Sequence, residues 1–172
     1  GAAAAAVPGA GDAPATGAVA PERPLAGRRV VVSAGGTREP IDPVRFIGNR
    51  STGKMGVAIA EAALDRGARV TVIAANVEVA LPPEATLARV ESTADLETAL
   101  ARALRNGDGS AGFDALVMAA AVSDFRPVDA GDVKLARSDG LELRLESTPD
   151  LLAGIAGEAA GGTLRPRPVL VG

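Results

Sequence analysis

The stretch Gly48–Gly56 (GNRSTGKMG) combines glycines, two hydroxyl side chains and a lysine directly before an expected helix. Glycine lets backbone N–H groups approach a ligand closely, and the first turn of a helix carries partial positive charge. Amides and a helix N-terminus that point the same way bind anions, most often phosphate. The sequence therefore predicts a phosphate-binding turn at Ser51, Thr52, Gly53 and Lys54.

The composition excludes most other catalytic chemistry. The 172 residues contain no Cys and no His, which excludes disulfides, thiolate catalysis, a Ser/His/Asp triad and metal sites built on either residue. With no Trp, no Tyr, three Phe and a net charge of −3, we expect no nucleic-acid partner. The remaining chemistry uses Lys, Arg, Asn, Asp, hydroxyls, backbone amides and an oxygen-bound Mg²⁺ (or Mn²⁺).

The apolar pattern predicts one α/β domain with a doubly wound, mostly parallel, Rossmann-like sheet that holds this turn. A helix is expected over 54–66, another starting near Thr93 and a third near Pro149, with Ser147 or Thr148 as its cap. The second helix has two candidate caps, Thr93 with Glu97 or Ser92 with Asp95. The expected strands are 28–33, 69–75, 87–90, 113–121 and 168–171.

Ligands bind at the carboxyl ends of strands in such a sheet. Gly35, Gly36 and Thr37 follow the first strand, where they form either a ligand contact or a plain turn. Asp124 follows the apolar strand 113–121 and either faces a ligand or makes an Asx-turn. Pro40 and Pro43 make 38–47 a loop, whose charged residues either bind the ligand or are solvated.

Outside the sheet we expect a linker, an arm and no membrane segment. Residues 1–27 are Ala, Gly and Pro, which predicts a disordered linker before a domain over 28–172. Segments 133–137 and 141–146 alternate around Ser138–Gly140, which predicts a projecting hairpin. Because we find no long apolar run and no signal peptide, we expect a cytoplasmic protein. The ends suggest a piece of a longer protein, truncated at its C-terminus.

Two common nucleotide-binding motifs fit the glycine turn only in part. Gly48–Lys54 matches the start of a P-loop, but Met55 stands where that motif has Ser or Thr. A long Pro-containing loop also separates the turn from its strand. An NAD(P) fold would place its glycines directly after the first strand and an acid at the end of the second, where Asn76 follows two alanines. NAD(P) binding stays an alternative.

Long motifs resemble one family, phosphopantothenoylcysteine synthetase. They are Ser33–Arg45 (SAGGTREPIDPVR) with Ile47–Asn49 and Ser51–Gly56, Ala119–Arg126 (AAAVSDFR), the Lys134 segment, and Thr148–Leu152 (TPDLL). In bacteria such a domain is usually fused behind an FMN-dependent decarboxylase. The resemblance implies that the carboxylate of 4′-phosphopantothenate attacks CTP to give an acyl-cytidylate, which L-cysteine converts to an amide. It also implies a homodimer formed through the hairpin arm.

The resemblance also implies roles for individual residues. Asn49 would hold the acyl-cytidylate, Arg45 would lie beside the substrate, and Lys134 would contact the triphosphate. The CTP contacts would be Met118, Ala119, Ala120, Asp124, Pro149, Asp150, Leu151 and Leu152. The arm departs from the family at Ala136, where a second basic residue is usual and Arg137 follows instead. A competing interpretation is a nucleotide-binding or oligomerisation module without ligase activity.

Overall fold

A computed structural model describes residues 23–136 and 141–172. Its centre is a five-stranded sheet in the order β5-β4-β1-β6-β9, in which every neighbouring pair is parallel. The strands are β1 (Arg29–Gly35), β4 (Arg69–Ala75), β5 (Thr86–Val90), β6 (Ala115–Met118) and β9 (Val169–Val171). Parallel order places all five carboxyl ends at one edge, so the predicted doubly wound α/β fold is confirmed.

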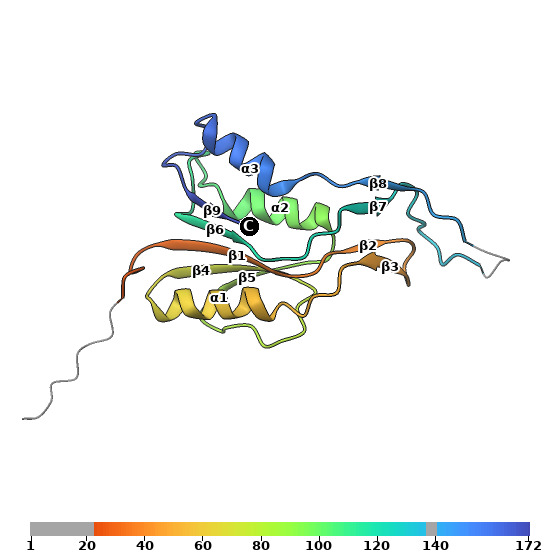
Figure 1. Cartoon of the computed structure of the whole chain (residues 1–172), viewed down its shortest axis with the longest axis horizontal. Helices are drawn as coiled ribbons and strands as arrows, with labels where there is room; N and C mark the ends of the chain where they lie inside the picture. The colour runs from red at the N-terminus through yellow and green to blue at the C-terminus, as the bar shows by residue number, and fades with distance from the viewer. Residues whose placement is uncertain (1–22, 137–140) are drawn as a thin grey trace, which may run out of the picture.

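Helices cover both faces of this sheet (Figure 1). Helix α1 (Lys54–Asp65) packs on one face, and α2 (Thr93–Ala103) and α3 (Leu151–Ala160) pack on the other. Strand β1 serves both cores because its side chains alternate. Val30 and Val32 join the cluster under α1, whereas Val31 joins the cluster under α2 and α3.

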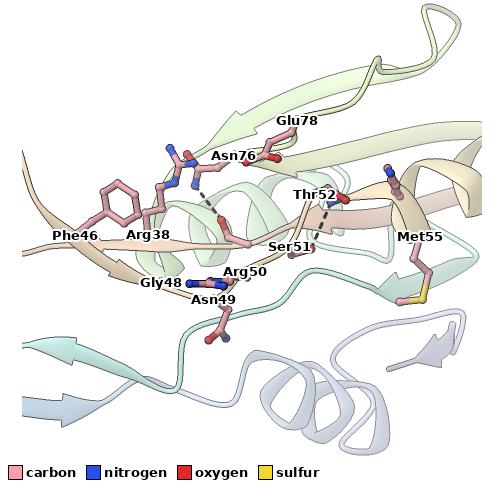
Figure 2. Close-up of a pocket in the computed structure, with 13 residues that line it drawn as sticks. Arg38, Phe46, Gly48, Asn49, Arg50, Ser51, Thr52, Met55, Asn76 and Glu78 are labelled. Atoms are coloured by element: carbon pink, nitrogen blue, oxygen red, sulfur yellow. Dashed lines mark hydrogen bonds between the residues drawn. The ribbon is translucent and has the colours of Figure 1, made fainter.

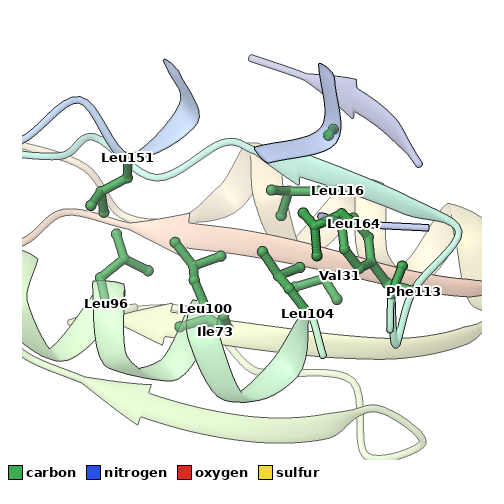
Figure 3. Close-up of a cluster of buried hydrophobic side chains, with 11 residues drawn as sticks. Val31, Ile73, Leu96, Leu100, Leu104, Phe113, Leu116, Leu151 and Leu164 are labelled. Carbon is green, nitrogen blue, oxygen red and sulfur yellow. The ribbon is translucent and has the colours of Figure 1, made fainter. Parts of the chain in front are cut away.

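The cluster under α2 and α3 holds the larger side chains (Figure 3). Leu96 and Leu100 on α2 and its C-cap residue Leu104 lie at helical spacing, and all are at most 2% exposed. They pack against Phe113 and Leu116 from the β6 segment. Burial of each such side chain contributes about 1.5–3 kcal/mol, so this cluster fixes how α2 lies on the sheet.

Two short antiparallel ribbons extend from the carboxyl edge. In one, β2 (Arg38–Pro40) pairs with β3 (Phe46–Gly48), and in the other, β7 (Phe125–Pro127) pairs with β8 (Leu145–Ser147). The prediction of an unpaired loop over 38–47 was therefore wrong at both ends of that stretch. An antiparallel ribbon does lie in this region, but its strands are β7 and β8, so the predicted pairing of 133–137 with 141–146 was wrong for the described residues. Leu135 instead bonds to Asp42 and Arg45, and residue 137 with the expected turn at 138–140 lies outside the described residues.

The helix starts test the predicted caps. Ser92 with Asp95 forms the capping box of α2, as one of the two candidates predicted. Helix α3 is capped by Asp150, which accepts a hydrogen bond from Ala153 N at 2.9 Å, and not by a hydroxyl. The hydroxyl of Thr148 is used elsewhere, since it donates to Ser123 O at 2.6 Å.

The apolar strand expected over 113–121 is shorter in the structure. Strand β6 ends at Met118, and Ala120 N donates to the hydroxyl of Ser33 instead of continuing the ladder. The preceding Asp114 binds Arg29 N at 2.7 Å before the strand begins. Among the helices that the structure describes, none is long and apolar enough to cross a bilayer.

Candidate functional site

The glycine turn forms one wall of a cavity of about 850 Å³ at the carboxyl ends of β1 and β4 (Figure 2). The residues predicted to form the phosphate-binding turn, Ser51–Lys54, all line it. Gly36 and Asn49 line it as well. The sequence prediction therefore placed the turn, the end of the first strand and the amide side chain in one place.

The start of α1 leaves its first-turn N–H groups available. Its N-cap is Gly53, no side-chain hydrogen bond caps it within the described residues, and its first turn contains no acid. The other two helices use a side chain at this point, Ser92 for α2 and Asp150 for α3. An uncapped start keeps its partial positive charge for a ligand, and exposed Lys54 adds a full one.

Close packing requires glycine in this turn. Gly53 has a φ of +81°, and a Cβ there would lie 2.8 Å from a methyl group of Val77. A Cβ on Gly36 would lie 2.6 Å from Asn49 O. A larger residue at either position would therefore displace the turn or the Asn49 backbone.

Seven residues that line this cavity were not among the predicted site residues. They are Arg38, Phe46, Gly48, Arg50, Met55, Asn76 and Glu78. Asn76 has a φ of +49°, and its side-chain amide donates to Gly36 O at 2.9 Å and to Glu91 O at 3.1 Å. It thereby ties the ends of β1, β4 and β5 together. Its signal in the sequence is its place directly after β4, since Asn is one of the few residues that tolerate this backbone conformation.

A second cavity, of about 470 Å³, lies beside the N-terminus of α3. It brings together Met118, Ala120 and Asp124 with Pro149, Asp150, Leu151 and Leu152, as the family resemblance implied. Ala119 is half-buried and is not among the lining residues. Two segments distant in sequence thus form one surface at the same edge of the sheet.

Asn49 connects the two cavities. It lines the first, and its Nδ2 donates at 2.9 Å to the carbonyl of Val122, which lines the second. The bond fixes the exposed Asn49 side chain between the glycine turn and the segment after β6. An amide at this position can bond to a ligand without reacting with it.

Two predicted residues of the first strand end lie outside both cavities. Thr37 is buried, and its hydroxyl accepts from Ser123 N at 2.8 Å and lies 3.3 Å from that of Thr93. Gly35 is also buried, with its amide face against Ala75. Both support the position of Gly36, the neighbour that does line the first cavity.

Arg45 and Lys134 also lie outside both cavities of their own chain. The Arg45 guanidinium pairs with the carboxylate of Asp42 and donates to Leu135 O at 3.1 Å. Arg45 and three backbone N–H groups hold the pKa of Asp42 well below its usual range. Lys134 is exposed on the segment that follows β7.

The donor set fits a magnesium ion carried by a ligand better than a protein-bound one. Among the described residues there is no group of three His, Cys, Asp or Glu placed to hold a metal ion. Asp124 and Asp150 line the second cavity, but Asp150 already caps α3. Mg²⁺ commonly uses one or two carboxylates together with substrate phosphates and water, which is what these residues offer.

Comparison with known proteins finds coenzyme A biosynthesis proteins among the relatives of this chain. The chain is 43% identical over 153 residues to the coenzyme A biosynthesis bifunctional protein CoaBC of Mycobacterium tuberculosis. The aligned residues cover 86% of this chain and 35% of that protein. It superposes on the crystal structure of a CoaBC C-terminal domain with a TM-score of 0.66 and 34% identity, covering 87% of this chain and 65% of that one. A Cab2 variant in complex with phosphopantothenate-cysteine shares the fold, with a TM-score of 0.56, 21% identity, and coverage of 73% and 58%.

The chain spans about a third of the length of the curated relatives it matches. The family model for the "DNA/pantothenate metabolism flavoprotein C-terminal domain" matches residues 25–172. This range contains all the described strands and helices, the glycine turn and both cavities. The chain therefore belongs to the family of DNA/pantothenate metabolism flavoprotein C-terminal domains.

Proposed function

We propose that this chain is a phosphopantothenate–cysteine ligase domain that uses CTP. The family membership supports this, as do the names of the relatives, which describe coenzyme A biosynthesis and a complex with phosphopantothenate-cysteine. The observation that carries the proposal is the pair of cavities joined by Asn49, one of which contains an uncapped helix start. One cavity suits phosphate, and the other leaves room for a second part of the reactants.

The proposed reaction needs charge stabilisation and alignment more than a titrating base. The carboxylate of 4′-phosphopantothenate attacks the α-phosphate of CTP, which forms an acyl-cytidylate and releases pyrophosphate. The amine of L-cysteine then attacks the acyl carbon, and CMP leaves. The first-turn amides of α1 and Lys54 would neutralise phosphate charge, while the Asn49 amide would hold the acyl-cytidylate between the cavities.

A Mg²⁺ (or Mn²⁺) ion would reach the site with the triphosphate. When bound, it neutralises charge on the phosphate oxygens and makes pyrophosphate a better leaving group. Exposed Asp124 is the carboxylate of the second cavity that is best placed to contact it. Any FMN would belong to a fused decarboxylase domain and not to the residues described here.

We further propose that the β7–β8 ribbon forms a homodimer. Its surroundings expose large apolar side chains, with Phe125 53%, Val133 73% and Leu145 41% exposed. Lys134 lies in the same region and outside the cavities of its own chain. A dimer formed here would let Lys134 serve the triphosphate of the partner subunit.

The test is a pyrophosphate assay with purified protein. Release from CTP should require phosphopantothenate, and amide product should also require cysteine. Release that ignores phosphopantothenate would contradict the proposal. Calorimetry adds a binding comparison: CTP with Mg²⁺ should bind, whereas binding of NADH alone would favour the NAD(P) alternative.

Asn49→Asp tests the proposed intermediate. The charged variant should accumulate acyl-cytidylate or convert it slowly, because a carboxylate repels the nucleotide phosphate and loses the Nδ2 bond to Val122. Asn106→Asp is a matched control, since the Asn106 amide also donates to a carbonyl, Ala111 O, but in the loop before β6. Normal turnover by Asn49→Asp would remove this residue from the site.

A further inference from the structure

The loop between β2 and β3 holds the segment that carries Lys134 at two points. Gly131 N donates to Ile41 O at 2.9 Å, and Leu135 N donates to the Asp42 carboxylate at 3.1 Å. One anchor precedes Lys134 and the other follows it directly. The backbone around this lysine is therefore fixed to the β2–β3 loop of its own chain.

Asp42 is the centre of the second anchor. Its side chain is fully buried, and the same carboxylate accepts from Val44 N at 2.9 Å and from Arg45 N at 2.8 Å. The Arg45 guanidinium adds a bond from Nε at 2.9 Å and also donates to Leu135 O. Both backbone groups of Leu135 thus have a partner in one ion pair, which we name the Asp42–Arg45 clasp.

Packing alone does not explain a buried carboxylate at this position. Removing a carboxylate from water is costly, and an apolar side chain would fill the same space with less penalty. The clasp instead supplies directional hydrogen bonds that orient the backbone N–H and C=O groups of Leu135. It also gives Arg45 two partners within the chain, Asp42 and Leu135.

We propose that Asp42 is a positioning residue for Lys134, acting through the Leu135 backbone and the Arg45 guanidinium. The role of Lys134 in the reaction rests on the proposed function, whereas the anchoring of residues 131–135 does not. Without the carboxylate, Leu135 N loses its acceptor and Arg45 loses its partner. Lys134 then samples many positions, and its ammonium group is less often at the triphosphate.

Hydrogen exchange measures the anchoring without any assay of activity. In Asp42→Asn, exchange of the amides in 131–135 should rise about tenfold, while those of the central sheet stay unchanged. Asp108→Asn is a matched control, because Asp108 also accepts from a backbone amide, Ser110 N, but in a different loop. Unchanged exchange at 131–135, or equal acceleration throughout the sheet, would overturn the proposal.

A double-mutant cycle then tests whether the clasp acts through Lys134. Asp42→Asn should lower kcat/KM about 10- to 100-fold in the wild-type background, since misplacing a reacting group by about 1 Å has effects of this size. In the Lys134→Ala background, Asp42→Asn should lower kcat/KM by less than about twofold. Equal losses in both backgrounds would overturn a role through Lys134. If no variant, including wild type, makes pyrophosphate from CTP, the proposed function fails, and the exchange data still decide the anchoring.

Discussion

The glycine turn and the loop between β2 and β3 are neighbours in the chain, yet they treat their polar groups in opposite ways. The stretch 38–47, which contains β2 and this loop, carries buried Glu39 and Asp42, and both carboxylates are used inside the protein, the first by Thr93 and the second by Arg45. The turn carries fewer charges, but the amides at the start of α1 have no side-chain cap among the described residues. A high density of charged residues therefore marks the region that supports the site. The candidate ligand site is marked instead by backbone N–H groups that no side chain caps among the described residues.

The largest effect in this comparison is expected from a substitution that pushes the glycine turn away from the sheet. In Gly56→Ala the new methyl group would lie 2.6 Å from Ala34 Cβ and 2.9 Å from Ser33 O. Overpacking of this kind should lower the free energy of unfolding by about 2 kcal/mol. Gly154→Ala is the control in α3, where a Cβ meets nothing within 4 Å.

Chemical denaturation measures both glycine variants. Gly154→Ala should be more stable than wild type by about 0.5–1 kcal/mol, because Ala favours the helix. The two substitutions should therefore change stability in opposite directions. Equal effects would show that the close contact between α1 and β1 is not what requires Gly56.

A smaller effect is expected when the capped start of α2 is compared with the uncapped start of α1. Ser92→Ala removes the α2 capping box and should cost about 1 kcal/mol of unfolding free energy. Ser51→Ala removes only a long contact of 3.4 Å with Gly53 N and should change stability by less than about 0.5 kcal/mol.

Calorimetric titration supplies the second half of that comparison. Ser51→Ala should weaken CTP binding, whereas Ser92→Ala should leave it close to wild type, since Ser92 lines neither cavity. A Ser51→Ala protein that loses stability but binds CTP normally would assign Ser51 a structural role.

The smallest expected effect is a change in how stability depends on pH. The folded pKa of Asp42 is lowered, chiefly by Arg45, from an unfolded value of about 4. Its contribution to stability is complete above that unfolded value and decreases as the pH falls toward the lower folded pKa. Between pH 5 and 3, roughly the range around the unfolded value, wild type should therefore lose stability more steeply than Asp42→Asn. Parallel curves from denaturation at each pH would contradict this.

The sequence predicted the sheet and α1 well because their signals are local. Apolar spacing and the glycine after Arg66 marked the helix, and β-branched runs marked β1 and β4. The short ribbons escaped prediction because three-residue strands depend on distant partners. The alternation in 133–137 indicated a strand, but Leu135 instead bonds to Asp42, about ninety residues away in sequence.

The residues of the candidate site also divide into those with local signals in the sequence and those that depend on distant partners. The glycine turn could be found from its own residues, because backbone freedom and a helix start are local properties. Apart from Asp124, the predicted residues of the second cavity came only from the family resemblance, since 118–124 and 147–152 meet through the fold. The charged loop was expected to be solvated or to contact ligand, and the burial of Glu39 and Asp42 contradicts both for these two residues. Asn76 was missed because its place directly after β4 does not reveal its tertiary contacts to Gly36 and Glu91.

The most direct test of the central claim is an amide NMR titration of this chain with CTP and Mg²⁺. If the uncapped start of α1 binds the nucleotide, the largest shifts should fall on the amides of residues 51–56 and then on 118–124. The amides of 42–45, already bonded within the clasp, should move little. Shifts concentrated on 42–45, or no shifts at 51–56 at saturating CTP, would contradict the account.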